Sequence, residues 1–265
     1  MKNISTNLKK IFGTVYVWIV LLFFYFPIIM VIIYSFNNTT SPNSAAWHGF
    51  SLRWYETLFK NSQVGLAVRN SFLIALLTVG ISIVLGTPAA LSMWERNLKI
   101  NQFLENLSYL SILLPEIIYG IAFLTWFSLL KLPFGLYSVA FAHSTFCIPY
   151  TIIMVHARLT SLDKSTVEAA RTLGASKVRA FFDIIVPDIL PAIFSSALLS
   201  FVLSLDNVII TTFSSGSDGT TLPLKIFSML KLNPSPVINS LCALMTLVTL
   251  LAVILRYLID TGGRK

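Results

Sequence analysis

The chain has 265 residues, of which 55% are hydrophobic and only 11% are charged, and its mean hydropathy is +0.79. Soluble domains carry about 25% charged residues, so this composition excludes an ordinary soluble domain and indicates an integral membrane protein. The net charge of +8 therefore has to be interpreted through membrane topology before any anionic partner is considered.

Six apolar segments are long enough to cross a bilayer, whose hydrocarbon core of about 30 Å needs about 20 residues of helix. They cover residues 12–36, 68–93, 106–130, 136–157, 189–213 and 237–259. The first is longer than the apolar region of a signal peptide and no small-residue cleavage site follows it, so we expect it to be retained. No repeat or linker divides the chain. We expect an all-α integral membrane protein with about six transmembrane helices in a single domain, residues 1–265, whose core covers about residues 66–257.

The distribution of basic residues predicts the side of the membrane on which each loop lies. With the N-terminus inside, thirteen of the nineteen Lys and Arg residues fall in cytoplasmic segments. The other six fall outside or near the outer ends of the spans: Arg53, Lys60, Arg69, Lys131, Lys225 and Lys231. Cytoplasmic loops are enriched in Lys and Arg, so both termini and the loop at 158–188 are expected in the cytoplasm. The net positive charge of the chain is thus explained by its membrane topology, and no nucleic acid partner is expected.

Two outer segments are longer than a connection requires. Residues 37–64 contain Trp47, Trp54 and Tyr55, which are expected to anchor a short helix at the membrane surface. Residues 214–236 contain an apolar stretch, 222–230, that is too short to span a membrane. That stretch predicts an interfacial or re-entrant helix.

The inner loop at 158–188 has several helix signals. Ser165 and Glu168 have the spacing of a capping box, which predicts a short helix beginning near Thr166. Gly174 suits the left-handed turn that ends such a helix, and Ser176 is placed to cap a second helix. Pro187 and Pro191 lie where the fifth span is expected to begin, a position that tolerates proline.

This loop also carries a spaced motif: Glu168-Ala169-Ala170, then Gly174, then Ile184-Ile185-Val186-Pro187. The motif resembles the cytoplasmic "EAA" signature of permease subunits of bacterial ABC importers, which usually have Leu at the position of Val186. The resemblance implies that the loop couples the permease to an ATPase. The coupling residues would be Glu168, Ala169, Ala170, Gly174, Ile184 and Pro187. The alternative is an ordinary amphipathic loop helix in which Glu168 is only a capping carboxylate.

Other segments are similar to the C-type permease subunit of spermidine/putrescine importers. They are 25–29, 35–37, 50–55, 203–207 and 223–229, with Ser235, Pro236 and Asn239 beyond them. This resemblance covers about residues 20–255. It implies the type I ABC importer permease fold and a location in the bacterial cytoplasmic (inner) membrane. It also implies partners: two copies of an ATP-binding ABC subunit, a second homologous permease subunit and an extracytoplasmic polyamine-binding protein, with membrane lipid around the spans.

The chain itself carries no signal for ATP chemistry. It has no Gly-rich phosphate loop of the G-x-x-x-x-G-K-[ST] kind, so ATP would be bound by the partner subunit, and we expect no cofactor and no catalytic residue here. Its three histidines lack the spacing of a metal site, and no metal is expected. The sequence predicts a transport subunit, with alternating access driven by the ATPase.

Two acidic residues lie well within predicted spans, Glu116 and Asp206. Charged groups at this depth are energetically unfavourable and are functional candidates, and carboxylates suit a polyamine. Glu116 follows Pro115, which breaks the helix, so Glu116 either begins a new half-helix for structural reasons or faces the pathway. The aromatic side chains of Tyr119 and Trp126 would accompany it.

Asp206 lies beside a polar stripe on the fifth span. The stripe consists of Ser196, Ser200, Ser204, Asn207 and Thr211, at three- and four-residue spacing. It either lines the pathway, which makes Asp206 and Asn207 substrate contacts, or packs against a neighbouring helix. A different cargo (ferric ion, an amino acid or thiosulfate) remains an alternative. So do an intramembrane enzyme and a self-sufficient channel or secondary transporter, although the acids stand apart and the signature loop would be unexplained.

Overall fold

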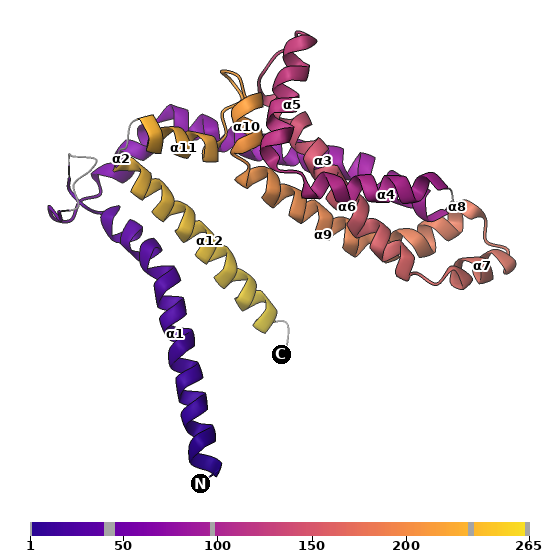
Figure 1. Ribbon diagram of the computed structural model, residues 1–265, viewed down its shortest axis with the longest axis horizontal. Helices are drawn as coiled ribbons and strands as arrows, with labels where there is room; N and C mark the ends of the chain where they lie inside the picture. Colours follow the sequence, from indigo (N-terminus) through magenta and orange to yellow (C-terminus); the bar gives the residue numbers. More distant parts are fainter. Residues whose placement is uncertain (1, 40–45, 96–98, 233–235, 263–265) are drawn as a thin grey trace. The chain divides into compact units, whose positions relative to one another are not determined.

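The computed structural model describes residues 2–39, 46–95, 99–232 and 236–262 (Figure 1). These residues are mainly helical, as expected, and the one β-bridge among them joins Asn37 and Phe50. The helices are α1 (Lys2–Tyr34), α2 (Arg53–Lys60), α3 (Ser62–Glu95), α4 (Lys99–Leu113), α5 (Glu116–Leu129), α6 (Leu136–Ser161), α7 (Lys164–Thr172), α8 (Lys177–Ala180), the π-helix η1 (Phe181–Ile185), α9 (Val186–Asp206), α10 (Ile209–Ser214), α11 (Leu222–Leu232) and α12 (Val237–Gly262).

The chain forms two compact units, residues 1–62 with 228–265, and residues 63–227. In the first unit α12 contacts both α1 and α2. The segment after α1 is fixed by Asn37, whose backbone carbonyl accepts a hydrogen bond from Trp54 Nε1 at 3.0 Å. Trp54 is therefore buried, and the expectation that it anchors the chain at the membrane surface is wrong, whereas Trp47 is exposed.

Four helices in the described part of the chain are long and apolar enough to cross a membrane. They cover Phe12–Tyr34, Ser62–Trp94, Leu136–Ser161 and Lys177–Asp206, and they coincide with the first, second, fourth and fifth predicted spans. The sixth predicted span lies within α12, and the predicted short helix near 222–230 is α11. The all-helical membrane fold is thus confirmed.

The third predicted span, 106–130, is interrupted at Pro115, as the sequence predicts, and Glu116 begins a new helix. α4 and α5 are bent by 102° at the break between them. Pro115 adopts an extended backbone (φ −57°, ψ 136°) just before α5. Proline has no N–H to continue the helix and disfavours a helical conformation in the preceding residue, so the chain turns at this point.

Both limits of the fifth predicted span, 189–213, are also wrong. The helix begins at Lys177, because α8, η1 and α9 follow one another without interruption. The π turn forms where Val186 N–H donates to the carbonyl of Phe181, just before Pro187 removes an N–H. At the other end Asn207 leaves the helical conformation (φ −73°, ψ 112°) and separates α9 from α10.

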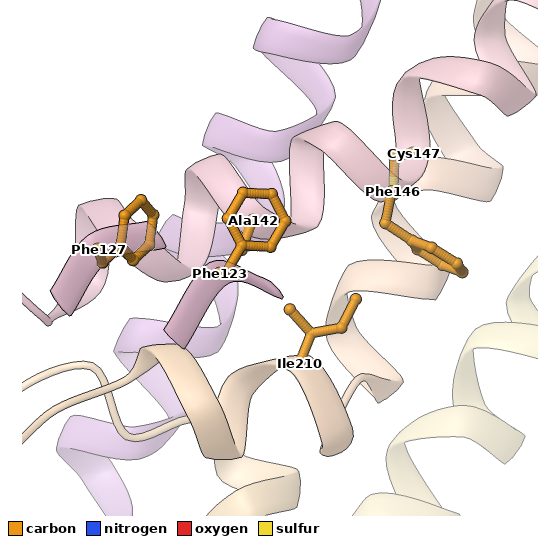
Figure 2. Close-up of a cluster of buried hydrophobic side chains, with 6 residues drawn as sticks. All are labelled: Phe123, Phe127, Ala142, Phe146, Cys147 and Ile210. Atoms are coloured by element: carbon orange, nitrogen blue, oxygen red, sulfur yellow. The ribbon is translucent and has the colours of Figure 1, made fainter. Parts of the chain in front are cut away.

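α6 is the centre of the second unit and contacts α4, α5, α9 and α10. α3 approaches α6 closely, since a Cβ on Gly86 would lie 2.8 Å from Thr151 Cβ. Figure 2 shows the apolar core where α5, α6 and α10 meet. Its buried side chains are Phe123, Phe127, Ala142, Phe146, Cys147 and Ile210. Within this unit α7 and α8 lie at one end, and α5 and α10 lie at the other (Figure 1).

Candidate functional site

The loop helix α7 begins earlier than the sequence predicts. Its N-cap is Asp163, whose Oδ1 accepts a hydrogen bond from the backbone N–H of Ser165 at 2.9 Å. The predicted capping box between Ser165 and Glu168 is therefore wrong, because an aspartate two residues upstream takes the cap. The hydrogen bonds from Ser165, first that of its backbone N–H, lower the pKa of Asp163 below its usual value.

The predicted end of α7 at Gly174 is confirmed. Gly174 has φ +94°, a left-handed conformation that L side chains rarely adopt. Its N–H donates to the carbonyl of Arg171 at 3.1 Å, and the N–H of Ala175 donates to the carbonyl of Ala170 at 3.0 Å. These two bonds form the Schellman arrangement, which requires the left-handed residue. Ser176 then caps α8 as expected, accepting from the N–H of Arg179 at 3.2 Å.

α7 is tied to the long helices at one end of the second unit. Val167 packs against a buried cluster to which α3, α6, η1 and α9 contribute: Ala90, Val155, Leu159, Ile185 and Ile189. Lys164 Nζ lies 5.2 Å from the centre of the Trp94 ring, at the end of α3. α7 is therefore attached to three long helices through close-packed side chains.

The other face of α7 is free within the second unit. None of the α7 residues is buried, and Glu168 and Ala169 are exposed. A groove of about 610 Å³ lies between α7, the end of α3 and the α8–η1 segment. It is lined by Leu91, Trp94, Lys164, Val167, Glu168, Arg171, Lys177, Val178, Ala180, Phe181, Phe182 and Ile185.

The remaining loop residues of the motif lie on the long helix that follows. Ile184 is half-buried in η1, and Pro187 is exposed near the start of α9. Next to it, Asp188 Oδ1 accepts a hydrogen bond from Arg158 Nη2 at 2.7 Å, and the Asp188 carbonyl accepts one from Arg158 Nε at 3.0 Å. This pair joins the end of α6 to the start of α9.

At the opposite end of the unit the structure brings together two of the predicted pathway residues. Asn207 Nδ2 donates to Glu116 Oε2 over 3.1 Å. Glu116 is the first residue of α5, as the sequence predicts, and Asn207 is the residue at which α9 ends. The contact therefore joins two helix interruptions, where backbone polar groups are free to meet polar side chains.

Asp206 adjoins Asn207 in the chain and Tyr119 lies about one turn after Glu116, whereas Trp126 lies about three turns after Glu116 along α5. Asp206 is the last residue of α9 and is exposed. The Tyr119 hydroxyl donates to the Ser111 carbonyl at 2.9 Å, across the α4–α5 bend, and its ring meets Phe146 edge-on. Trp126 is 43% exposed and packs against the rings of Phe123, Phe127 and Phe141.

The polar stripe on α9 is mainly a packing surface. Ser196, Ser200 and Ser204 are all buried, on a helix that packs against α6. Small residues allow two helices to approach closely in a membrane. His143 of α6, which was not among the predicted site residues, is buried and bonded to Ser204 and Thr211. Only its position in an apolar segment could have indicated such a role.

A match to a known protein family identifies the class of transporter to which this chain belongs. The family described as "Binding-protein-dependent transport system inner membrane component" matches residues 82–261, well over half of the chain. The chain belongs to this family. It is a membrane-spanning subunit of an ABC importer of the bacterial inner membrane, and it works with an ATPase and a substrate-binding protein. An intramembrane enzyme and a self-sufficient channel are thereby set aside.

Individual relatives extend the match over most of the chain. The spermidine/putrescine transport system permease protein PotC of Haemophilus influenzae is 34% identical over 92% of this chain and 94% of its own length. PotC of Escherichia coli K12 is 33% identical over 92% and 91%. The putrescine transport system permease protein PotI of E. coli K12 is 37% identical over 84% and 81%. The resemblance to C-type polyamine permeases is confirmed.

Solved structures support the permease fold. A bacterial ABC transporter involved in the import of the acidic polysaccharide alginate has a chain that matches with a TM-score of 0.75, at 15% identity, over 97% of both chains. The MetNI methionine ABC transporter matches with a TM-score of 0.59, at 16% identity, over 74% of this chain and 91% of that chain. At these identities the likeness concerns the fold, and the cargo has to be argued from the site.

Proposed function

We propose that this permease subunit moves polyamines, spermidine or putrescine, into the cytoplasm. The observation that carries the proposal is the acidic cluster at the two helix breaks, where Glu116 is bonded to Asn207 and Asp206 is the neighbouring residue. Among the described residues, neither carboxylate forms an ion pair with a basic side chain. Uncompensated carboxylates suit a cationic cargo and disfavour an anion such as thiosulfate. Relatives named for spermidine and putrescine support the same choice.

The cluster supplies the groups that a polyamine needs. An ammonium group that leaves water must exchange its hydration for carboxylates, amide oxygens or aromatic faces. Glu116 and Asp206 supply the charge, Asn207 orients Glu116, and Tyr119 supplies aromatic surface one turn along α5. Trp126 would offer a second aromatic face further along the same helix.

The α7 end of the unit is the proposed site of coupling to the ATPase. Its exposed helix, its groove and its rigid attachment to α3, α6 and α9 support this role. The docking residues are Glu168, Ala169, Ala170, Gly174, Ile184 and Pro187. Two ATPase copies would lie beneath this chain and a second, homologous permease, with both termini of this chain in the cytoplasm. Closure of the ATPase dimer would then move α7 and switch the pathway between its two openings.

Uptake measurements test the cargo and the acidic cluster together. Cells that lack this gene would be complemented with the wild type, with Asp206→Asn, or with Asp218→Asn as a matched control at an exposed loop aspartate. We expect the wild type and the control to restore uptake of labelled spermidine and putrescine, and Asp206→Asn to lose roughly tenfold or more at equal membrane abundance. Full uptake by Asp206→Asn would exclude this residue from the pathway. An unchanged uptake on deletion, in a strain without other polyamine importers, would contradict the cargo.

A further inference from the structure

His143 spans the break between α9 and α10. Its Nδ1 lies 2.9 Å from Ser204 Oγ, three residues before the break, and its Nε2 lies 3.0 Å from Thr211 Oγ1, just after it. The side chain is only 1% exposed. Each ring nitrogen thus meets a hydroxyl on a different side of the interruption, so one side chain of α6 holds both flanking helices.

The hydrogen bonds continue from this histidine to the acidic cluster. Thr211 Oγ1 donates to the backbone carbonyl of Asn207 at 2.7 Å. The Asn207 carboxamide uses both of its ends: Oδ1 accepts from the N–H of Ile210 at 2.9 Å, and Nδ2 donates to Glu116. A continuous series of bonds therefore runs from His143 through Thr211 and Asn207 to the carboxylate at the start of α5. On its other side Ser204 Oγ lies 3.3 Å from Thr78 Oγ1 of α3.

The direction of these bonds follows from the number of protons available. Thr211 has one hydroxyl hydrogen and donates it to Asn207, so it can only accept from His143. Nε2 of the neutral ring therefore carries the proton, and Nδ1 accepts from the hydroxyl of Ser204. In this tautomer both ring nitrogens have a partner, one on each side of the break, which makes the arrangement directional. The single hydroxyl hydrogen of Ser204 then goes to Nδ1 and is not available to Thr78.

We propose that His143 is a positioning residue that fixes the α9–α10 break and, through Thr211 and Asn207, the orientation of the Glu116 carboxylate toward the cargo. This inference rests on the proposed function, in which Glu116 meets an ammonium group of a polyamine. Asp206 and Asn207 lie within the segment that His143 holds. Loss of the imidazole removes one hydrogen-bond partner from each of two buried hydroxyls, on the two sides of the break, so the connection between α9 and α10 through α6 is lost.

The test uses the complete importer in proteoliposomes, with putrescine uptake measured over a range of concentrations. The variants are His143→Leu, which removes both bonds, and His143→Gln, which keeps one donor and one acceptor. Ser144→Ala is the matched control, because Ser144 is the next residue of α6, is equally buried and bonds only within its own helix among the described residues. Glu116→Gln and the double variant His143→Leu/Glu116→Gln complete a double-mutant cycle, which measures the coupling between His143 and Glu116.

We expect His143→Leu to raise the KM for putrescine about tenfold, because the Asn207–Glu116 hydrogen bond that orients the carboxylate is weakened. The effect on the maximal rate per assembled importer should be smaller. His143→Gln should recover part of this loss, and Ser144→Ala should behave like the wild type. The double variant should be no worse than Glu116→Gln alone, because both substitutions act on one group. A merely structural histidine would lower the amount of assembled importer and leave KM unchanged.

Three results would overturn the proposal. The first is an unchanged KM in His143→Leu, and the second is an effect that simply adds to that of Glu116→Gln. If His143→Leu does not assemble, Thr211→Val removes the same connection more mildly, and an unchanged KM in that variant is the third. A wrong cargo assignment gives a different result, because the wild-type importer would then take up no putrescine. That result would contradict the positioning role as well, since the role is defined for a polyamine cargo.

Discussion

Asn207 Nδ2 and Glu116 Oε2 are 3.1 Å apart, although 91 residues separate them in the chain. Each residue lies at a helix interruption. Glu116 follows Pro115, which separates α4 from α5, and Asn207 is the non-helical residue that ends α9. Because these interruptions face one another, a carboxylate deep in an apolar segment obtains a hydrogen bond from a side-chain amide. The contact thereby provides a polar site without an ion pair, which leaves the charge available to a cation.

The first prediction concerns this contact. Asn207→Leu removes the donor to Glu116 and the acceptor for the N–H of Ile210 at the start of α10. We therefore expect it to lower the free energy of unfolding by about 1–3 kcal/mol and to reduce uptake. Thermal unfolding of the purified protein in detergent, followed by exposure of the native cysteines, measures the first effect. Ser195→Ala, on an exposed side of α9, is the control. Equal stability of the two variants would show that the contact contributes nothing.

Gly174 leads to a prediction about coupling. At φ +94° a branched side chain is strained by about 1–2 kcal/mol, so Gly174→Val should distort the turn after α7. We expect lost uptake and weaker co-purification of the ATPase, with normal insertion in the membrane. Gly174→Asn, which tolerates the left-handed region better, should keep most of both. Retention of full uptake by Gly174→Val would argue against a coupling role for this turn.

The N-cap of α7 gives a prediction about pH. The pKa of Asp163 is lowered in the folded protein by its hydrogen bonds from Ser165, so its contribution is complete above the unfolded value of about 3.9. The contribution is lost as the pH falls through the lower folded value. Hydrogen exchange of the α7 amides should therefore be faster in Asp163→Ala than in the wild type at pH 6–7. The difference should disappear only in strong acid; a difference lost near pH 6 would contradict the assignment.

The two ion pairs near the loop should differ in their effect on stability. Arg158 and Asp188 have side-chain exposures of 46% and 24%, and they join α6 to α9, whereas Arg179 and Asp183 are 77% and 62% exposed within one helical stretch. Asp188 Oδ2 is buried without a partner among the described residues. We expect Arg158→Gln to lower the free energy of unfolding by about 1–2 kcal/mol, and Arg179→Gln by less than about 0.5 kcal/mol. The denaturation midpoints of the two variants, each of which lacks one arginine charge, measure this difference. Equal shifts of the two midpoints would contradict the prediction that the Arg158–Asp188 pair contributes more.

Local signals were sufficient for much of this protein. The six apolar segments identified the long helices, the Gly174 and Ser176 signals identified the turn and the cap in the loop, and the spaced motif identified the family. These features depend on neighbours within a few residues, where propensity, capping and hydrophobic length act directly. The same reasoning placed Glu116 at the start of a new helix, because proline acts on the residues next to it.

The errors had local and distant causes. The cap of α7 was assigned to Ser165, although Asp163, two residues upstream, takes it. The segment 189–213 was treated as one span, although α9 ends at Asn207, whose side chain bonds Glu116 from a distant part of the chain. Trp54 was expected at a membrane surface, yet a backbone carbonyl seventeen residues away holds it in the interior.

The sequence by itself determined that this is a helical membrane subunit of a binding-protein-dependent importer, because apolar length and a spaced motif are properties of the chain alone. Only the tertiary structure decided that three serines of α9 pack against α6, and that Asn207 turns instead to Glu116. It also decided that His143 connects α9 to α10. Whether a buried polar group becomes a packing contact or part of a site depends on which donors and acceptors the fold places within about 3 Å of it.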